Sequence, residues 1–154
     1  MSKSQRLWRY SLITVICLKF IHYVSLFLAG GLGVANAMLF KNHNKAEMTP
    51  ALPVQKTMMT LARLGLVSIV LLWATGIPLT FKVYGTFDLG WPFHLKMFGA
   101  TILLVAVAFL NIHLTQQAKA GSSPNPSVMR VIPPIARTSL ALVLIGVAVL
   151  TTLF

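Results

Sequence analysis

The sequence predicts an all-α integral membrane protein, an antiparallel four-transmembrane-helix bundle with both termini on the same side. Of its 154 residues, 56% are hydrophobic and only 10% are charged, whereas about a quarter of the residues are charged in a soluble domain. Four apolar stretches are long enough to cross a ~30 Å hydrocarbon core, which takes about 20 helical residues. The connections between them are short, so consecutive helices are expected to run antiparallel.

The expected spans are 11–40, 61–81, 94–114 and 135–154, and together they form a single transmembrane domain. A helix over 11–40 is ~45 Å long, which exceeds what one bilayer needs. We expect its core to run from Phe20 to Phe40, with Lys19 reaching the headgroups. The apolar segment 10–18 then lies in the interface, tilts into the membrane or packs on another subunit. The stretches do not alternate in hydrophobicity, so strands are not expected.

Helix-breaking residues mark the three connections. Segment 41–60 is polar and contains two prolines, segment 82–92 contains two glycines and a proline, and segment 116–134 includes a turn-rich run at 121–126. Gly76 and Pro78 predict a kink or an end near the close of the second span. The basic N-terminus resembles a signal peptide, but the apolar stretch is too long and Lys19 and His22 interrupt it. We therefore expect a retained helix.

The chain is strongly basic, with 13 Lys and Arg against two acids, Glu47 and Asp88. The basic residues lie between the apolar stretches rather than along one element. We therefore expect them to meet anionic lipid headgroups and not nucleic acid. The positive-inside rule slightly favours a cytoplasmic position for segments 41–60 and 116–134. The expected location is the inner membrane of a bacterium, as a multi-pass protein.

The histidines near the start of the first and third spans are the first functional candidates, because ionisable groups within a membrane are costly. His22 shares a helical face with Lys19, and His94 precedes Lys96, so both lysines are candidate cofactor contacts beside these histidines. Because both helices start on the terminal side, His22 and His94 are expected at similar depth. The alternatives are a helix–helix hydrogen bond for His22 and a headgroup-facing position for His94.

A second pair of histidines is expected at the opposite membrane face. His43 and His113 follow the first pair by helical rises of ~31 Å and ~28 Å. Two facing histidine pairs are what axial ligation of haem iron in a bundle needs. We therefore predict haem b, with His22 and His94 as the first choice of iron ligands. His43 can equally be a loop residue, and His113 an interfacial one.

Small residues also cluster in the first span. Ala29, Gly33 and Ala37 recur at a spacing of four, beside Gly30. Such a seam lets a neighbouring helix approach closely, and it can equally give a haem ring room to lie against the helix. Gly30 and Gly33 are therefore candidate cofactor contacts, with helix packing as the alternative.

Several short motifs resemble those of one protein family. Residues 18–22 (LKFIH), 29–32 (AGGL), 39–40 (LF) and 43 (H) are similar to the first helix of the HemJ-type protoporphyrinogen oxidases. Residues 91–96 (WPFHLK) resemble that family's Trp-Leu-His-x-Lys motif. The CopD-like copper-resistance proteins, which have a similar His and Gly-Gly helix, are equally close. Two positions differ from the first family. Its Trp before Ala-Gly is replaced here by Phe27 or Leu28, and its Arg before Leu-Phe is replaced by Met38.

The resemblance implies a b-type haem or porphyrin held by the bundle, with His22 as an axial ligand. It also places Lys96 near the porphyrin or its propionates. The expected function is then electron transfer or porphyrin oxidation. One alternative is a non-catalytic accessory subunit of a larger respiratory or photosynthetic complex, which would bring other membrane subunits or a second copy as partners. Another is CopD-like copper transport.

Overall fold

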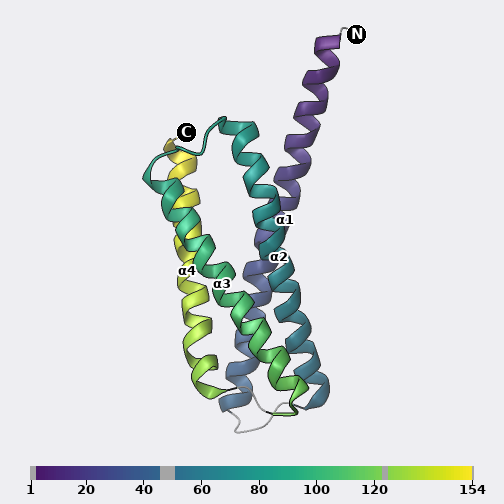
Figure 1. Ribbon diagram of the computed structural model, residues 1–154, viewed down its shortest axis with the longest axis vertical. Helices are drawn as coiled ribbons and strands as arrows, with labels where there is room; N and C mark the ends of the chain where they lie inside the picture. Colours follow the sequence, from purple (N-terminus) through teal and green to yellow (C-terminus); the bar gives the residue numbers. More distant parts are fainter. Residues whose placement is uncertain (1–2, 46–50, 123–124, 154) are drawn as a thin grey trace.

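The computed structural model describes residues 3–45, 51–122 and 125–153, and it consists of four long helices (Figure 1). They are α1 (Lys3–Lys45), α2 (Leu52–Tyr84), α3 (Trp91–Lys119) and α4 (Pro126–Leu153). Each contains a stretch long and apolar enough to cross a membrane, over Leu12–His43, Pro53–Tyr84, Trp91–Lys119 and Ser127–Thr152. The predicted four-helix membrane bundle is confirmed, and the two chain ends lie on the same side.

The bundle is built from two helix hairpins. α1 packs along α2, α3 packs along α4, and the two hairpins meet less extensively, mainly through α2 and α3. A buried asparagine joins them: the side-chain amide of Asn111 on α3 donates to the carbonyl of Ala62 on α2 at 3.1 Å. Each hairpin is therefore the tighter unit, and the interface between the hairpins is the looser one.

All four helices begin before the predicted spans, and α2 and α4 do so by the widest margin. α2 starts at Leu52 with Pro53 in its first turn, where the missing proline N–H leaves no hydrogen bond unmade. α4 starts at Pro126 and continues through Pro133 and Pro134, where the sequence predicts a connection. Transmembrane helices tolerate proline because neighbouring groups satisfy the freed carbonyls. The connections are correspondingly shorter than predicted.

Pro78 does not end α2, contrary to one of the two outcomes predicted for it. The helix continues to Tyr84 and ends at Gly85, whose φ of 70° is left-handed. The Gly85 N–H donates to the carbonyl of Phe81 at 3.1 Å, which satisfies one of the last carbonyls of the helix. Glycine suits this position because it has no Cβ to oppose a positive φ.

The first helix is much longer than a bilayer is thick. α1 has 43 residues, and at 1.5 Å per residue it is about 65 Å long. Segment 10–18 continues the helix without a break, and the N-terminal part of α1 extends past the other three helices (Figure 1). Further along the same helix, Leu12, Ile13 and Ile16 are each more than half exposed. The apolar stretch that could cross a membrane covers Leu12–His43, and the start of the membrane core at Phe20 stays a prediction.

A close helix contact lies between α3 and α4, at two glycines that the sequence reasoning did not single out. A Cβ on Gly146 would lie 2.9 Å from both the carbonyl oxygen of Pro92 and the Cβ of Lys96. A Cβ on Gly99 would lie 3.0 Å from the carbonyl oxygen of Ser139. Small residues let helix backbones approach this closely within a membrane, and here they hold the first turns of α3 against α4.

The two candidate glycines of the predicted small-residue seam of α1 make no comparable contact. Gly33 is exposed and has nothing within 4 Å of a Cβ built on it, and Gly30 has only the tip of Leu140 at 3.7 Å. Within the described chain, neither glycine is needed for close helix packing.

Replacing Gly146 with alanine should destabilise the bundle, because the new methyl group meets backbone atoms that cannot rotate away. Overpacking of this kind costs ~1–3 kcal/mol. We expect the thermal unfolding midpoint of the purified protein in mild detergent to fall by several degrees. Gly33→Ala is the matched control, and its midpoint should stay the same or rise. Equal midpoints for Gly146→Ala and the wild type would show that α3 and α4 are not held this closely.

Candidate functional site

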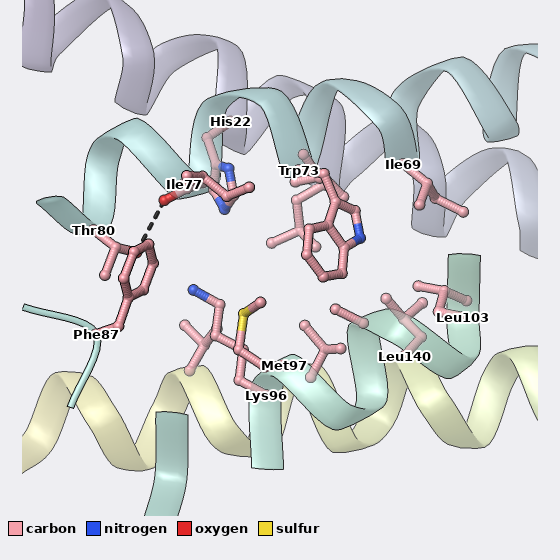
Figure 2. A pocket seen from close by; sticks show the side chains of 16 residues that line it. His22, Ile69, Trp73, Ile77, Thr80, Phe87, Lys96, Met97, Leu103 and Leu140 are labelled. Carbon is pink, nitrogen blue, oxygen red and sulfur yellow. Dashed lines mark hydrogen bonds between the residues drawn. The ribbon is translucent and has the colours of Figure 1, made fainter. Parts of the chain in front are cut away.

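A cavity lies between the two hairpins, and all four helices contribute to its walls (Figure 2). Its volume is about 70 Å³, enough for several water molecules, and it is only partly enclosed. The walls are mainly apolar and include Ile69 and Leu72 from α2, Leu103 from α3 and Val143 from α4. A cavity of this kind within a membrane is suited to a ligand that is itself largely apolar.

His22 brings an imidazole from α1 into this cavity. Its Nδ1 lies 2.9 Å from the hydroxyl oxygen of Thr75 on α2, so Nε2 is the ring nitrogen that the hydrogen bond leaves available. The ring rests against Gly76, where an added Cβ would lie only 3.2 Å from the His22 Cε1. Two consecutive residues of α2 thus position the ring, one by a hydrogen bond and one by leaving room for it.

Lys96 brings an ammonium group from α3 to the facing side of the same cavity. Figure 2 shows its side chain extending from the opposite wall toward the His22 ring. The first carbons of the side chain pass the close contact at Gly146, and Nζ lies 6.0 Å from the centre of the Phe93 ring. That distance is at the limit of a cation–π contact.

The Lys96 ammonium has no counter-charge on the described part of the chain. No carboxylate pairs with it there, and Asp88 is exposed in the connection between α2 and α3. Because an ammonium group among apolar walls is costly without a partner, Lys96 is a strong functional candidate. An anionic group of a ligand would supply the missing counter-charge.

The structure does not bring His94 into the cavity with His22. His94 is exposed, and its ring meets the edge of Phe93 at a centroid distance of 6.2 Å. Residues two positions apart point about 200° apart around a helix. Because Lys96 faces the cavity, His94 faces away from it. The two histidines therefore do not form a facing pair in this structure.

His43 and His113 lie at the other end of the bundle, and each has a local partner. The His43 Nδ1–H donates to the carbonyl of Leu39 at 2.9 Å, within α1. The His113 Nε2 accepts from the backbone N–H of Asn125 at 3.2 Å, and its ring stacks on Phe109 at a centroid distance of 6.4 Å. His113 thereby ties the end of α3 to the residue before α4.

The remaining predicted residues lie outside the cavity. Lys19 is exposed one turn before His22, and neither Gly30 nor Gly33 belongs to the lining. Among the described residues, no group of three or more His, Cys, Asp or Glu side chains gathers as a metal site would require. Of the eight residues predicted to bind a cofactor, the structure places His22 and Lys96 together.

Sequence reasoning missed the role of Thr75 and Gly76. By sequence, Thr75 is only a polar residue of the second span and Gly76 only a possible kink. A usable signal is present, because an antiparallel first hairpin puts the end of α2 at the depth of His22. A Thr-Gly pair at that depth offers a hydrogen-bond partner and room for an aromatic ring.

Comparison with protein-family models, with characterised proteins and with solved structures finds no match to this chain. The resemblance to the HemJ-type and CopD-like proteins stays a prediction. A functional assignment therefore depends on the residues of the cavity itself.

Replacing Lys96 with methionine should stabilise the protein. The change keeps much of the side-chain volume and removes an unpaired charge from an apolar cavity, which relieves a cost on the order of 1–3 kcal/mol. We expect the thermal unfolding midpoint in mild detergent to rise by a few degrees. Lys82→Met, which removes an exposed lysine at the end of α2, should leave it unchanged. A lowered midpoint for Lys96→Met would instead mean that the ammonium group supports the fold.

Proposed function

We propose that this chain is a membrane protein that binds a b-type haem or porphyrin between its two hairpins and acts in electron transfer or porphyrin oxidation. One observation carries the proposal: His22 on α1 and Lys96 on α3 converge from facing walls on a cavity that is otherwise mainly apolar. Two costly ionisable groups directed at one apolar space are typical of a functional site within a membrane.

The chemistry of these two groups fits such a ligand. A histidine nitrogen is a common axial ligand of haem iron, and the hydrogen bond at Nδ1 leaves Nε2 of His22 for this role. The Lys96 ammonium would pair with a carboxylate at the edge of the porphyrin, and the apolar walls would contact the ring. A bound haem would supply one-electron redox chemistry. We assign His22 alone as the protein ligand, because His94 is exposed.

Binding of a whole porphyrin requires the two hairpins to move apart. The ring is larger than a cavity of about 70 Å³, which holds only several water molecules. The looser packing between the hairpins and the incomplete enclosure of the cavity support such a movement. Each hairpin can keep its own close contacts while it occurs, since the contacts at Gly76 and Gly146 lie within the hairpins.

The haem proposal is tested by optical spectra of the purified protein in mild detergent, supplied with hemin, in the oxidised and dithionite-reduced states. We expect a Soret band with sharp reduced α and β bands, and one haem per chain by pyridine haemochrome. His22→Ala should lose the haem. The exposed His94 provides the matched control, since His94→Ala should keep it. A wild-type protein that stays colourless, or His22→Ala with its full haem content, would refute the proposal.

We further propose that the protein lies in a bacterial inner membrane with its two chain ends outside the cytoplasm. Because Lys96 lies in the cavity, it no longer counts among the surface cations of the terminal side. The basic residues left near that side are Lys3, Arg6, Arg9, Lys19 and Lys82. Those near the opposite side are Lys41, Lys45, Lys56, Lys119 and Arg130, with Arg63 and Arg137 further along the helices. The positive-inside rule therefore favours cytoplasmic α1–α2 and α3–α4 connections.

Reporter fusions should confirm this orientation. Alkaline phosphatase fused after Phe154 should be active and green fluorescent protein at the same point dark, because phosphatase matures only outside the cytoplasm. Fusions placed after Gly121, in the α3–α4 connection, should behave in the opposite way. The reversed pattern at both points would place the chain ends in the cytoplasm.

A role as an accessory subunit of a larger respiratory or photosynthetic complex is a second candidate, and it is compatible with haem binding. Helix α1 favours it, because its N-terminal part extends past the bundle (Figure 1) and Leu12, Ile13 and Ile16 further along the same helix are exposed. Exposed apolar surface on this helix offers a contact to another membrane subunit. In native gels after mild extraction, the chain should then migrate with larger partners. Migration as a monomer or self-dimer would argue against this role.

A further inference from the structure

We infer that Thr75 is a positioning residue that holds the imidazole of His22 in the Nδ1–H tautomer, so that Nε2 presents its lone pair to the cavity. The inference deepens the proposed function and rests on it, since an unprotonated ring nitrogen is what binds haem iron. It nevertheless concerns a proton on this chain's own side chain, which can be observed without any ligand.

The direction of the hydrogen bond follows from counting protons. A threonine hydroxyl has one proton to donate and two lone pairs to accept with. The Thr75 oxygen lies 2.6 Å from the carbonyl oxygen of Leu71 and 3.4 Å from that of Leu72. Carbonyl oxygens only accept, so the hydroxyl proton goes to Leu71, the nearer one. The hydroxyl oxygen also lies 2.9 Å from the His22 Nδ1. In this second hydrogen bond the oxygen must be the acceptor, and the His22 Nδ1–H is the donor.

The protonation of the second ring nitrogen follows. In a neutral imidazole one nitrogen carries the proton and the other a lone pair. With the proton on the His22 Nδ1, the lone pair is on Nε2. A metal-binding histidine usually donates its other N–H to a carboxylate, a carbonyl or water, which fixes the ring and its tautomer. Here the Thr75 hydroxyl is the acceptor of the Nδ1–H, and it donates its own hydrogen bond to the Leu71 carbonyl of α2.

Thr75 is well placed to hold this arrangement. It is only 6% exposed, so its hydroxyl cannot turn to bulk water for another partner. Gly76, the next residue, leaves the ring just enough room: an added Cβ would lie 3.2 Å from the His22 Cε1. The ring is thus restrained at two positions on α2.

The usual bond of a helical threonine to its own backbone explains the contact of Thr75 with Leu71, but not its contact with His22. Serine and threonine hydroxyls in helices commonly bond to the carbonyl four residues earlier, and Thr80 does so to Gly76 at 2.9 Å. Thr80 also lines the cavity and is buried. Thr75 differs because a ring nitrogen 53 residues away in the sequence meets its remaining acceptor site. Thr80 is therefore a matched control for a buried threonine without this contact.

The test is the tautomer of His22, read from the ring ¹⁵N chemical shifts of histidine-labelled protein in detergent, without haem. His22→Gln assigns the signals of this ring among the four histidines. We expect Nδ1 to be protonated in the wild type and in Thr75→Ser, which keeps the hydroxyl. Thr75→Val keeps the shape but removes the acceptor, so the Nε2–H tautomer should appear. Thr80→Val should leave the His22 signals as in the wild type.

Three outcomes would overturn the inference: an Nε2–H tautomer in the wild type, an unchanged Nδ1–H tautomer in Thr75→Val, or the same switch in Thr80→Val. Unchanged signals of His43, His94 and His113 show that the variant is folded. Haem titration separates this inference from the proposed function. If haem binds, Thr75→Val should weaken its affinity about 10- to 100-fold. If haem does not bind to the wild type, the haem proposal fails while the tautomer still decides the role of Thr75.

Discussion

The absence of water from the bilayer interior is the constraint on which the rest of this structure depends. Backbone N–H and C=O groups must find partners inside the protein there, and helices satisfy them within one segment. The buried hydroxyls follow the same rule. Those of Ser68, Thr80 and Ser139 all donate to the carbonyl four residues earlier in their own helix. Such hydroxyls need no hydrogen-bond partner on a neighbouring helix, so most contacts between helices are apolar.

The described residues include two side-chain contacts between helices that depart from this pattern, at Asn111 and at His22, and the two have different roles. The Asn111 amide donates across to α2 at Ala62 and ties the two hairpins together in the half away from the cavity. The His22 ring meets Thr75 within the first hairpin. The first contact holds elements together, whereas the second orients a side chain that faces an open space. Together they leave the cavity end of the hairpin interface free of such a tie between the described residues.

Each hairpin carries one ionisable group to the shared interface, and a glycine on the partner helix makes room for it. Gly76 on α2 accommodates the His22 ring of α1, and Gly146 on α4 accommodates the start of the Lys96 side chain of α3. The site is therefore split between two tightly packed units. Neither hairpin has both groups, so the cavity chemistry exists only where the hairpins face each other.

The sequence by itself determined the four helices, their antiparallel order and the depth of the histidines. These follow from the length and apolarity of each stretch and from the helical rise, which tertiary packing does not change. The ends of the helices were less predictable. Pro53, Pro133 and Pro134 read as signs of a connection, yet the chain tolerates them within helices, because packing in a membrane outweighs local propensity.

Only the tertiary structure decided which side of each helix faces inward. α1 and α3 are apolar nearly all round, so their sequences carry little information about rotation about the helix axis. His94 and Lys96 are both at the right depth, but the contact of α3 with α4 at Gly99 and Gly146 turns Lys96 toward the cavity and His94 away. In the same way, the packing of α1 against α2 sets the rotation of α1 about its axis and brings His22 to Thr75. The depth of a residue in the membrane follows from its position along one helix. The direction in which its side chain points depends on how two helices pack, so it required the structure of the whole bundle.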